Sequence, residues 1–259
     1  MSDTPNYIRG AWSILKALRS GHPNPTGDGS VDHAEFEKVL VRMKNGGLGM
    51  LPDLHPNLLD YVTRLEGIDP DSLTRSDSLA YWLNLYNAGA LLLASEAQEA
   101  GLTSVLRTPG IFHRDRFVVR GESLSLDDVE HGKIRRFGEP RIHGALVCGS
   151  LSCPTLRPEP FTGASLEYQL DDQMRRFLAG GAVAIDTNRR SVTLSKVFQL
   201  YGPDFVRPTA MPAFRPVRKA TILTALSPWL DDKSRSHLAG GGLSLSYQDY
   251  DWSLACTIG

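Results

Sequence analysis

The stretch Leu79-Ala-Tyr-Trp-Leu-Asn-Leu-Tyr-Asn-Ala-Gly-Ala-Leu-Leu-Leu-Ala94 decides the fold. Its apolar residues occupy every face of a helix, which is typical of a helix buried on all sides. The run is shorter than the roughly 20 residues that a membrane span needs, and Asn84 and Asn87 interrupt it. We therefore predict a central buried helix, within a helical region from Ser76 to Ala100, and no membrane span.

The segments on either side of this helix differ in their hydrophobic period. Helical patterns precede it, whereas short runs with a strand-like pattern follow it, mixed with further helices. This order predicts an α+β fold, in which an N-terminal helical block packs on a small, mainly antiparallel sheet. The predicted helices are 32–44, 56–66, 126–137, 164–179, 195–201, 217–226 and 228–238, and the predicted strands are 116–120, 122–124, 142–148, 182–186, 191–194 and 243–247.

Length and composition limit the class of protein. With 259 residues, of which 41% are hydrophobic, the chain can bury a large core, and we expect a single domain over 1–259, with 1–50 as a helical extension and 51–259 as the core. A net charge of −1 without a basic tract argues against nucleic-acid binding. Three cysteines and no visible signal peptide predict a cytoplasmic protein, although a secreted protein trimmed at its N-terminus would begin in the same way. No pattern indicates the oligomeric state.

A cluster of chemically active residues lies between Leu124 and Pro154. It holds Glu130, His131, His143, Cys148 and Cys153, the residue types of a cysteine nucleophile site. Because Pro154 suits the first position of a helical turn, we expect Cys153 at an N-cap, where the helix dipole favours the thiolate. The alternative is a cysteine that only packs. Cys148 and Cys153 could also oxidise to a disulfide across the turn at Gly149.

The histidine that acts as base is open between two candidates. Glu130 and His131 are adjacent, so on a helix they point about 100° apart. His143 lies at the start of a predicted strand, and Cys153 lies beyond its end. We expect His131 or His143 as the base and Glu130 as the carboxylate that orients it.

Three further residues are candidates for substrate binding: Asn84, Asn87 and Cys148. The two asparagines lie at i and i+3 on one face of the buried helix, and buried amides need partners. They would either hold neighbouring loops or, with backbone N–H groups near Cys153, bind an oxyanion. Core packing is the alternative for Cys148.

Two metal sites are conceivable, although the predicted function needs no cofactor. His131, His143, Cys148 and Cys153 could bind zinc, but the spacing of the cysteines is wider than in a zinc finger. The loop from Asn24 to Glu35 resembles an EF-hand loop, with Asp28, Asp32 and Glu35 as calcium ligands. A capped loop before a helix is the alternative.

At these residues the chain resembles the family called domain of unknown function 547. The resemblance extends over nearly the whole chain, through motifs that include 80–88, 124–132, 141–157, 194–198, 201–205 and 250–254. It implies that Glu130, His131, His143, Cys148 and Cys153 match the family pattern without substitution. Gly144 and Ala255 depart from it, because the family usually has a bulky aromatic residue and an asparagine there.

An early helix followed by a sheet is also similar to papain- and transglutaminase-like thiol enzymes. Those enzymes carry their cysteine on the early helix, where this chain has Asn84. The sequence thus predicts a cysteine-dependent hydrolase or acyl transferase that acts on an amide, peptide or thioester-like bond of a small molecule or peptide. A module that binds a thiol-containing small molecule or peptide without catalysis, and a structural zinc protein, are the alternatives.

Overall fold

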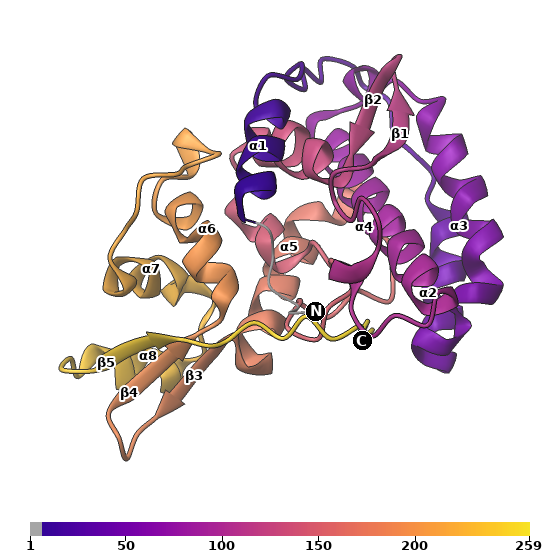
Figure 1. Cartoon of the computed structure of the whole chain (residues 1–259). Coiled ribbons are helices and arrows are strands. Elements are labelled where there is room, and N and C mark those ends of the chain that lie inside the picture. Colours follow the sequence, from indigo (N-terminus) through magenta and orange to yellow (C-terminus); the bar gives the residue numbers. More distant parts are fainter. Residues whose placement is uncertain (1–6) are drawn as a thin grey trace. The chain divides into compact units, whose positions relative to one another are not determined.

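A computed structural model describes residues 7–259, with side chains from Trp12 onward. The chain forms two compact units (Figure 1). The first contains the residues up to Phe137, Ala145–Leu166 and Asp251–Gly259, and the second contains Gly138–Gly144 and Glu167–Tyr250. Helices and two small sheets together confirm the α+β class. The single-domain organisation and the papain-like arrangement stay predictions.

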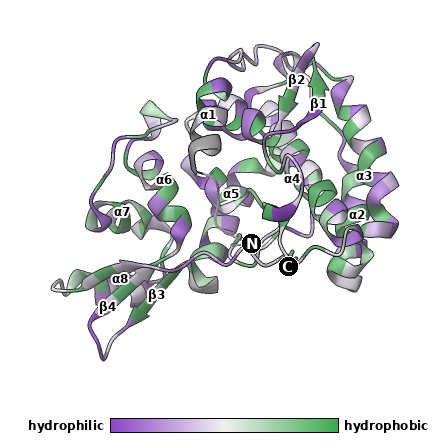
Figure 2. Cartoon of the chain, in the orientation of Figure 1, coloured by the Kyte–Doolittle hydropathy of each residue, from purple (hydrophilic) through white to green (hydrophobic). Residues whose placement is uncertain are grey.

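The first unit is built around its longest helix. Every residue of α4 from Ser78 to Ser95 is buried, as the apolar sequence predicts. Figure 2 shows α4 as largely hydrophobic, whereas α2 and α3 alternate in hydropathy. The helices of this unit are α1 (Tyr7–Ala17), α2 (Ala34–Gly46), α3 (Leu51–Glu66) and α4 (Arg75–Glu99), with short 3-10 turns at Gly47–Met50, Pro70–Ser72 and Val105–Arg107. Among the described helices, none has both the length and the apolar character that crossing a membrane requires.

Helix starts in the first unit differ slightly from the predictions. Thr74 caps α4, because its Oγ1 accepts a hydrogen bond from the Asp77 N–H at 3.1 Å. Helix α3 begins at Leu51 rather than at Pro56, and Pro56 lies inside it. Pro52, the second residue of α3, is tolerated because the first N–H groups of a helix have no intrahelical partner, whereas Pro56, the sixth residue, removes one hydrogen bond of the helix.

The predicted hairpin after α4 is confirmed. Strands β1 (Asp115–Val119) and β2 (Glu122–Ser125) are antiparallel, with Val119 opposite Glu122. Arg120 and Gly121 form the turn with φ values of 53° and 76°, the left-handed geometry that a two-residue hairpin loop favours.

The helical segment that follows β2 is partly a π-helix. Its π-helical part covers Asp128–Lys133, and a 3-10 turn covers Ile134–Phe137. Ser125 caps it as predicted: its Oγ accepts from the Asp128 N–H at 3.2 Å, and the Asp128 carboxylate accepts from the Ser125 N–H at 2.9 Å. Burial opposes ionisation of Asp128, but hydrogen bonds from Ser125 and Lys16 hold its pKa below the usual value.

The predicted strand at 142–148 is wrong. Pro140–Gly144 is a 3-10 turn, and the residues from Ala145 to Cys148 are irregular. A short apolar run has no period that separates a strand from other buried segments. Here the Asn87 side chain hydrogen-bonds the Ala145 carbonyl and the Val147 N–H. In a strand, a neighbouring strand would make such bonds.

The second unit combines helices with a three-stranded sheet. In it β3 (Val183–Asp186) and β4 (Ser191–Leu194) form the predicted hairpin. Strand β5 (Ser244–Tyr247) pairs in parallel with β4, so the sheet is mixed. The helices are α5 (Leu166–Phe177), α6 (Lys196–Val206), α7 (Lys219–Leu226) and α8 (Asp232–Ala239), with a π-helical turn at Leu178–Ala182 and 3-10 turns at Pro208–Ala210 and Ser227–Trp229. The 3-10 turn at Gly163–Ser165, just before α5, belongs to the first unit.

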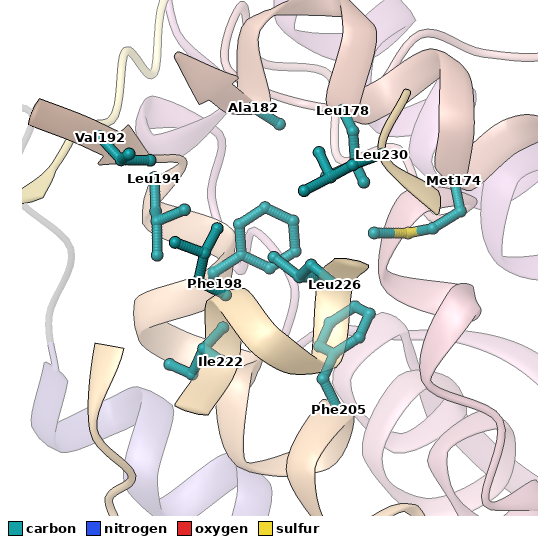
Figure 3. Close-up of a cluster of buried hydrophobic side chains, with 11 residues drawn as sticks. Met174, Leu178, Ala182, Val192, Leu194, Phe198, Phe205, Ile222, Leu226 and Leu230 are labelled. Carbon is teal, nitrogen blue, oxygen red and sulfur yellow. The ribbon is translucent and has the colours of Figure 1, made fainter. Parts of the chain in front are cut away.

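The second unit has its own hydrophobic core. Figure 3 shows side chains from α5, β4, α6 and α7 that converge on one cluster, in which Phe198 and Leu226 are completely buried. Helices α6 and α7 approach closely at Gly202, where an added Cβ would lie 2.3 Å from the Ile222 side chain. This packing holds α6 firmly, which matters because α6 carries a carboxylate of the candidate site.

A buried histidine makes the first unit sensitive to acid. His33 is 4% exposed, and its Nδ1 lies 2.7 Å from the Tyr61 hydroxyl. Burial and the Arg64 charge lower the pKa of His33 to about 4. Because the unfolded chain takes up a proton near pH 6.5, the free energy of unfolding should fall as the pH drops from about 6.5 to 4, by up to roughly 3 kcal/mol.

Urea unfolding between pH 7 and pH 4 measures this loss. His33→Gln should flatten the pH dependence in that window, whereas His22→Gln, at an exposed histidine, should leave it unchanged. An equal slope in the wild type and the His33 variant would contradict the assignment.

Candidate functional site

The two cysteines of the motif lie together in the first unit. The Cys148 and Cys153 sulfur atoms are 2.7 Å apart, and both residues are half-buried. The Ser150 Oγ lies 3.3 Å from the Cys148 sulfur and 3.1 Å from the Cys153 sulfur. The Cys148 N–H also donates to the Cys153 sulfur at 3.1 Å. Cys153 is therefore surrounded by groups that can donate to a thiolate.

A tight turn creates this cluster. Gly149 has a φ of 80°, which favours glycine, and the Cys153 N–H donates to the Ser150 carbonyl at 3.1 Å. Cys153 is followed by irregular chain and not by a helix, so the predicted N-cap position is wrong. The groups around the Cys153 sulfur are therefore donors of the turn itself and not the N-terminus of a helix. The helix fails to form because its first turn would have to end before Pro158, a residue that disfavours helix at the position before it.

The C-terminal segment of the first unit supports the turn. The Ala255 N–H donates to the Gly149 carbonyl at 3.1 Å, and the Leu151 N–H donates to the Ser253 carbonyl at 3.0 Å. Cys256 follows directly and is buried. Burial, with a smaller effect of Cys153, raises the pKa of the Cys256 thiol to about 12. A buried thiol with a raised pKa is inert near neutral pH, so Cys256 is not a candidate nucleophile.

Glu130 and His131 lie on the π-helical turn, and both are buried. The Tyr86 hydroxyl donates to Glu130 Oε2 at 3.2 Å. Glu130 Oε1 lies 3.7 Å from His131 Nδ1, beyond hydrogen-bond length, as expected for neighbours on a helix. Arg135 Nη1 lies 3.2 Å from the same Nδ1. Since a guanidinium only donates, Arg135 donates to the lone pair of His131 Nδ1.

His143 has a different environment in the second unit. Its Nε2 lies 2.8 Å from Asp204 Oδ2, and both side chains are almost completely buried. The Tyr201 ring stacks on the imidazole with 4.1 Å between centroids. Asp204 Oδ1 accepts from the Ala213 N–H at 2.6 Å, which fixes the carboxylate. The carboxylate favours a proton on Nε2, and the lone pair then lies on Nδ1, as in a catalytic base oriented by an acid.

Asp204 is a site residue that the sequence reasoning missed. It belongs to the Tyr201-Gly-Pro-Asp-Phe motif. Tyr201, Asp204 and Phe205 are spaced i, i+3 and i+4 on α6, so they share the face that contacts His143. A single aspartate between aromatic residues is a weak signal without the partner histidine, which is 61 residues away in the sequence.

Asn84 and Asn87 both hold backbone segments of the first unit. Asn84 donates to the Phe161 carbonyl at 2.7 Å and accepts from the Phe161 N–H at 3.0 Å. Asn87 donates to the Ala145 carbonyl at 3.1 Å and accepts from the Val147 N–H at 3.0 Å. Because Asn87 fixes the segment that leads into Cys148, and Tyr86 beside it bonds Glu130, one turn of α4 supports both groups.

Replacement of Asn87 should destabilise the protein strongly. Asn87→Ala leaves the Ala145 carbonyl and the Val147 N–H without this partner, at about 1–3 kcal/mol for each buried group. Chemical unfolding should therefore show a loss of roughly 2–5 kcal/mol. Asn57→Ala, on the exposed side of α3, is the matched control and should change stability by less than about 0.5 kcal/mol. A loss at Asn87 as small as this would contradict the supporting role.

The predicted calcium ligands have other partners. Asp32 Oδ1 accepts from the Ala34 N–H at 2.9 Å at the start of α2, and Glu35 pairs with Arg64 at 3.1 Å. Asp28 lies on the exposed part of this loop. Over the described residues, no three His, Cys, Asp or Glu side chains form a group that could hold a metal ion. Neither calcium nor zinc enters the function proposed below.

One comparison with known proteins gave a match. Residues 70–178 match the family described as "Protein of unknown function, DUF547". This segment contains α4, Glu130, His131, His143 and both cysteines of the turn, and over it the chain is similar to this family, as the resemblance predicts. Asp204 and the C-terminal motifs lie outside the matched residues. No curated protein and no solved structure gave a match.

Proposed function

We propose that this protein is a cysteine-dependent hydrolase or acyl transferase that acts on an amide, peptide or thioester-like bond. The observation that carries the proposal is the environment of the Cys153 sulfur, which has the Cys148 N–H at 3.1 Å and the Ser150 hydroxyl at 3.1 Å. Hydrogen bonds to a thiolate favour the ionised form, and the thiolate is the nucleophile. Cys256 is buried and its pKa is raised to about 12, so it is not part of the proposal.

Two histidines are candidates for the base. His131 lies with Glu130 and Cys153 in the first unit, whereas His143 lies with Asp204 in the second unit. The proposal gives the base role to one of them, with Glu130 as the carboxylate that orients His131 or Asp204 as the one that orients His143. The variants below separate the two assignments. Both Asn84 amide atoms bond Phe161, and this favours backbone N–H groups as the oxyanion donors.

The proposed reaction has two steps. The histidine takes the proton of the Cys153 thiol, and the thiolate attacks the acyl carbon so that a C–S bond forms. The bond between the acyl carbon and the leaving group then breaks, and the histidine gives its proton to the leaving group. In a hydrolase, water then attacks the thioester and gives its proton to the histidine, which releases the acid and the free thiol. In an acyl transferase, an amine, alcohol or thiol takes the place of water.

Alkylation of the reduced, folded protein with iodoacetamide tests the proposal. The rate at each cysteine, read by peptide mass spectrometry from pH 5 to pH 10, should rise at Cys153 with a midpoint below about 8.5, the value for an ordinary thiol. Cys256 should stay unmodified while the protein is folded, because it is buried. Slow labelling of all three cysteines would contradict the enzyme and favour a binding module, which should instead show a rise in melting temperature with its ligand.

A further inference from the structure

We propose that Cys148 and Cys153 form a reversible disulfide, and that this dithiol is a redox site. The two sulfur atoms lie 2.7 Å apart as free thiols, compared with about 2.05 Å in a disulfide bond. Both residues are half-buried, so a small oxidant can reach them, whereas the third cysteine is 8% exposed. Among the three cysteines, only Cys148 and Cys153 therefore lie close to another thiol and are also accessible to an oxidant.

The turn brings the two cysteines together. Gly149 in its left-handed conformation reverses the chain, and the Cys153 N–H donates to the Ser150 carbonyl, which closes the turn. The Cys148 N–H donates to the Cys153 sulfur at 3.1 Å and so links the backbone of one cysteine to the side chain of the other. Because the fold already holds the two sulfur atoms 2.7 Å apart, they need to approach by less than about 1 Å to reach the length of a disulfide bond.

The chemistry is balanced with a hydroperoxide as the oxidant. The Cys153 thiolate attacks one peroxide oxygen, so that an S–O bond forms, the O–O bond breaks and hydroxide leaves. The Cys148 sulfur then attacks the sulfenic acid of Cys153, which forms the S–S bond and expels the second oxygen as water. Two thiols and one hydrogen peroxide thus yield one disulfide and two molecules of water. A dithiol reductant reverses the bond by thiol–disulfide exchange.

Ser150 is suited to both directions of this reaction. Its hydroxyl lies within hydrogen-bond distance of both sulfur atoms, at 3.3 and 3.1 Å. It can donate to the sulfur that carries negative charge, whether Cys153 attacks the peroxide or is released on reduction. If Cys153 is the nucleophile, a consequence that rests on the proposed function, the disulfide also stops catalysis reversibly.

Peroxide titration of the reduced protein tests the inference. Mass spectrometry of intact protein and of peptides prepared without reductant should show the loss of two hydrogens and a Cys148–Cys153 link, both reversed by dithiothreitol. Cys256→Ser, the matched control, should form the same link. In Cys148→Ser, the sulfenic acid of Cys153 should persist and react with dimedone, which it does not in the wild type. Absence of the link, or over-oxidation of Cys153 in the wild type at equimolar peroxide, would overturn the inference.

The two proposals fail in different ways. A Cys148–Cys153 link together with an ordinary alkylation midpoint at Cys153 would leave the redox site standing and remove the enzyme. A low alkylation midpoint without the link would do the opposite. Circular dichroism of each variant shows whether it is folded, and the wild-type titration, which involves no substitution, decides the inference by itself.

Discussion

Cys153→Ser should abolish turnover and leave the melting temperature nearly unchanged. Serine retains the size of the side chain and can still contact the Ser150 hydroxyl and the Cys148 N–H, but its hydroxyl is not ionised near neutral pH. Loss of a nucleophile in an acyl-transfer site lowers turnover by roughly 10⁴-fold or more. A panel of thioester, ester and peptide reporter substrates measures turnover, and differential scanning calorimetry measures melting.

The third cysteine provides the matched control for this variant. Cys256→Ser places a hydroxyl at a buried position, so it should lower stability by about 1–3 kcal/mol while turnover stays unchanged. The opposite pattern, a large fall in stability for Cys153→Ser with turnover retained, would assign Cys153 to packing and contradict the proposed nucleophile.

Asp204→Asn should have the second largest effect. The substitution keeps the shape of the side chain but removes the charge that holds the proton on His143 Nε2. If His143 is the base, the wrong tautomer should lower turnover about 10⁴-fold. Asp204 is 0% exposed, and an amide in its place can present an N–H to the Ala213 N–H, so we also expect a loss of stability, on the order of 2 kcal/mol.

A pair of histidine variants separates catalysis from packing at Asp204. His143→Gln should lower turnover as much as Asp204→Asn, and the double variant should be no worse than either single one, because the two residues act as a unit. Asp232→Asn, at an exposed position of α8, should change neither property. If His131→Gln abolishes turnover and Asp204→Asn does not, the base is His131 and the role assigned to Asp204 is wrong.

Local signals in the sequence predicted several elements correctly. The hairpins at β1–β2 and β3–β4 follow from alternating patterns around short turns, and Ser125 caps the segment after β2 as its pattern indicates. The predictions of calcium ligands and of an N-cap at Cys153 also rest on short sequence patterns. Whether such a prediction holds depends, however, on distant residues that bond to the same side chains and backbone groups, as the ion pair between Glu35 and Arg64 illustrates.

The candidate site was predictable in its parts but not in its pairing. Glu130, both histidines and the two cysteines stand out by residue type, whereas Asp204 does not, because an isolated aspartate is common on a protein surface. The partners of the two candidate bases, Arg135 at His131 and Asp204 at His143, are visible only in the folded chain. The turn at Gly149 follows from the sequence, but the hydrogen bonds that its Cys148 N–H and Ser150 hydroxyl make with the Cys153 sulfur do not.

The apolar run of α4 determines that this helix is central, since a helix without a polar face has to be buried on all sides. The α+β class is likewise determined by the sequence, through its composition and the order of its helical and strand-like patterns. Only the tertiary structure decides that Ala145–Cys148 is held by Asn87 and is not a strand, that the Cys148 and Cys153 sulfurs meet, and that Asp204 orients His143. The physical reason is that burial depends on residue type, whereas each hydrogen-bond partner depends on which distant groups the fold brings within about 3 Å.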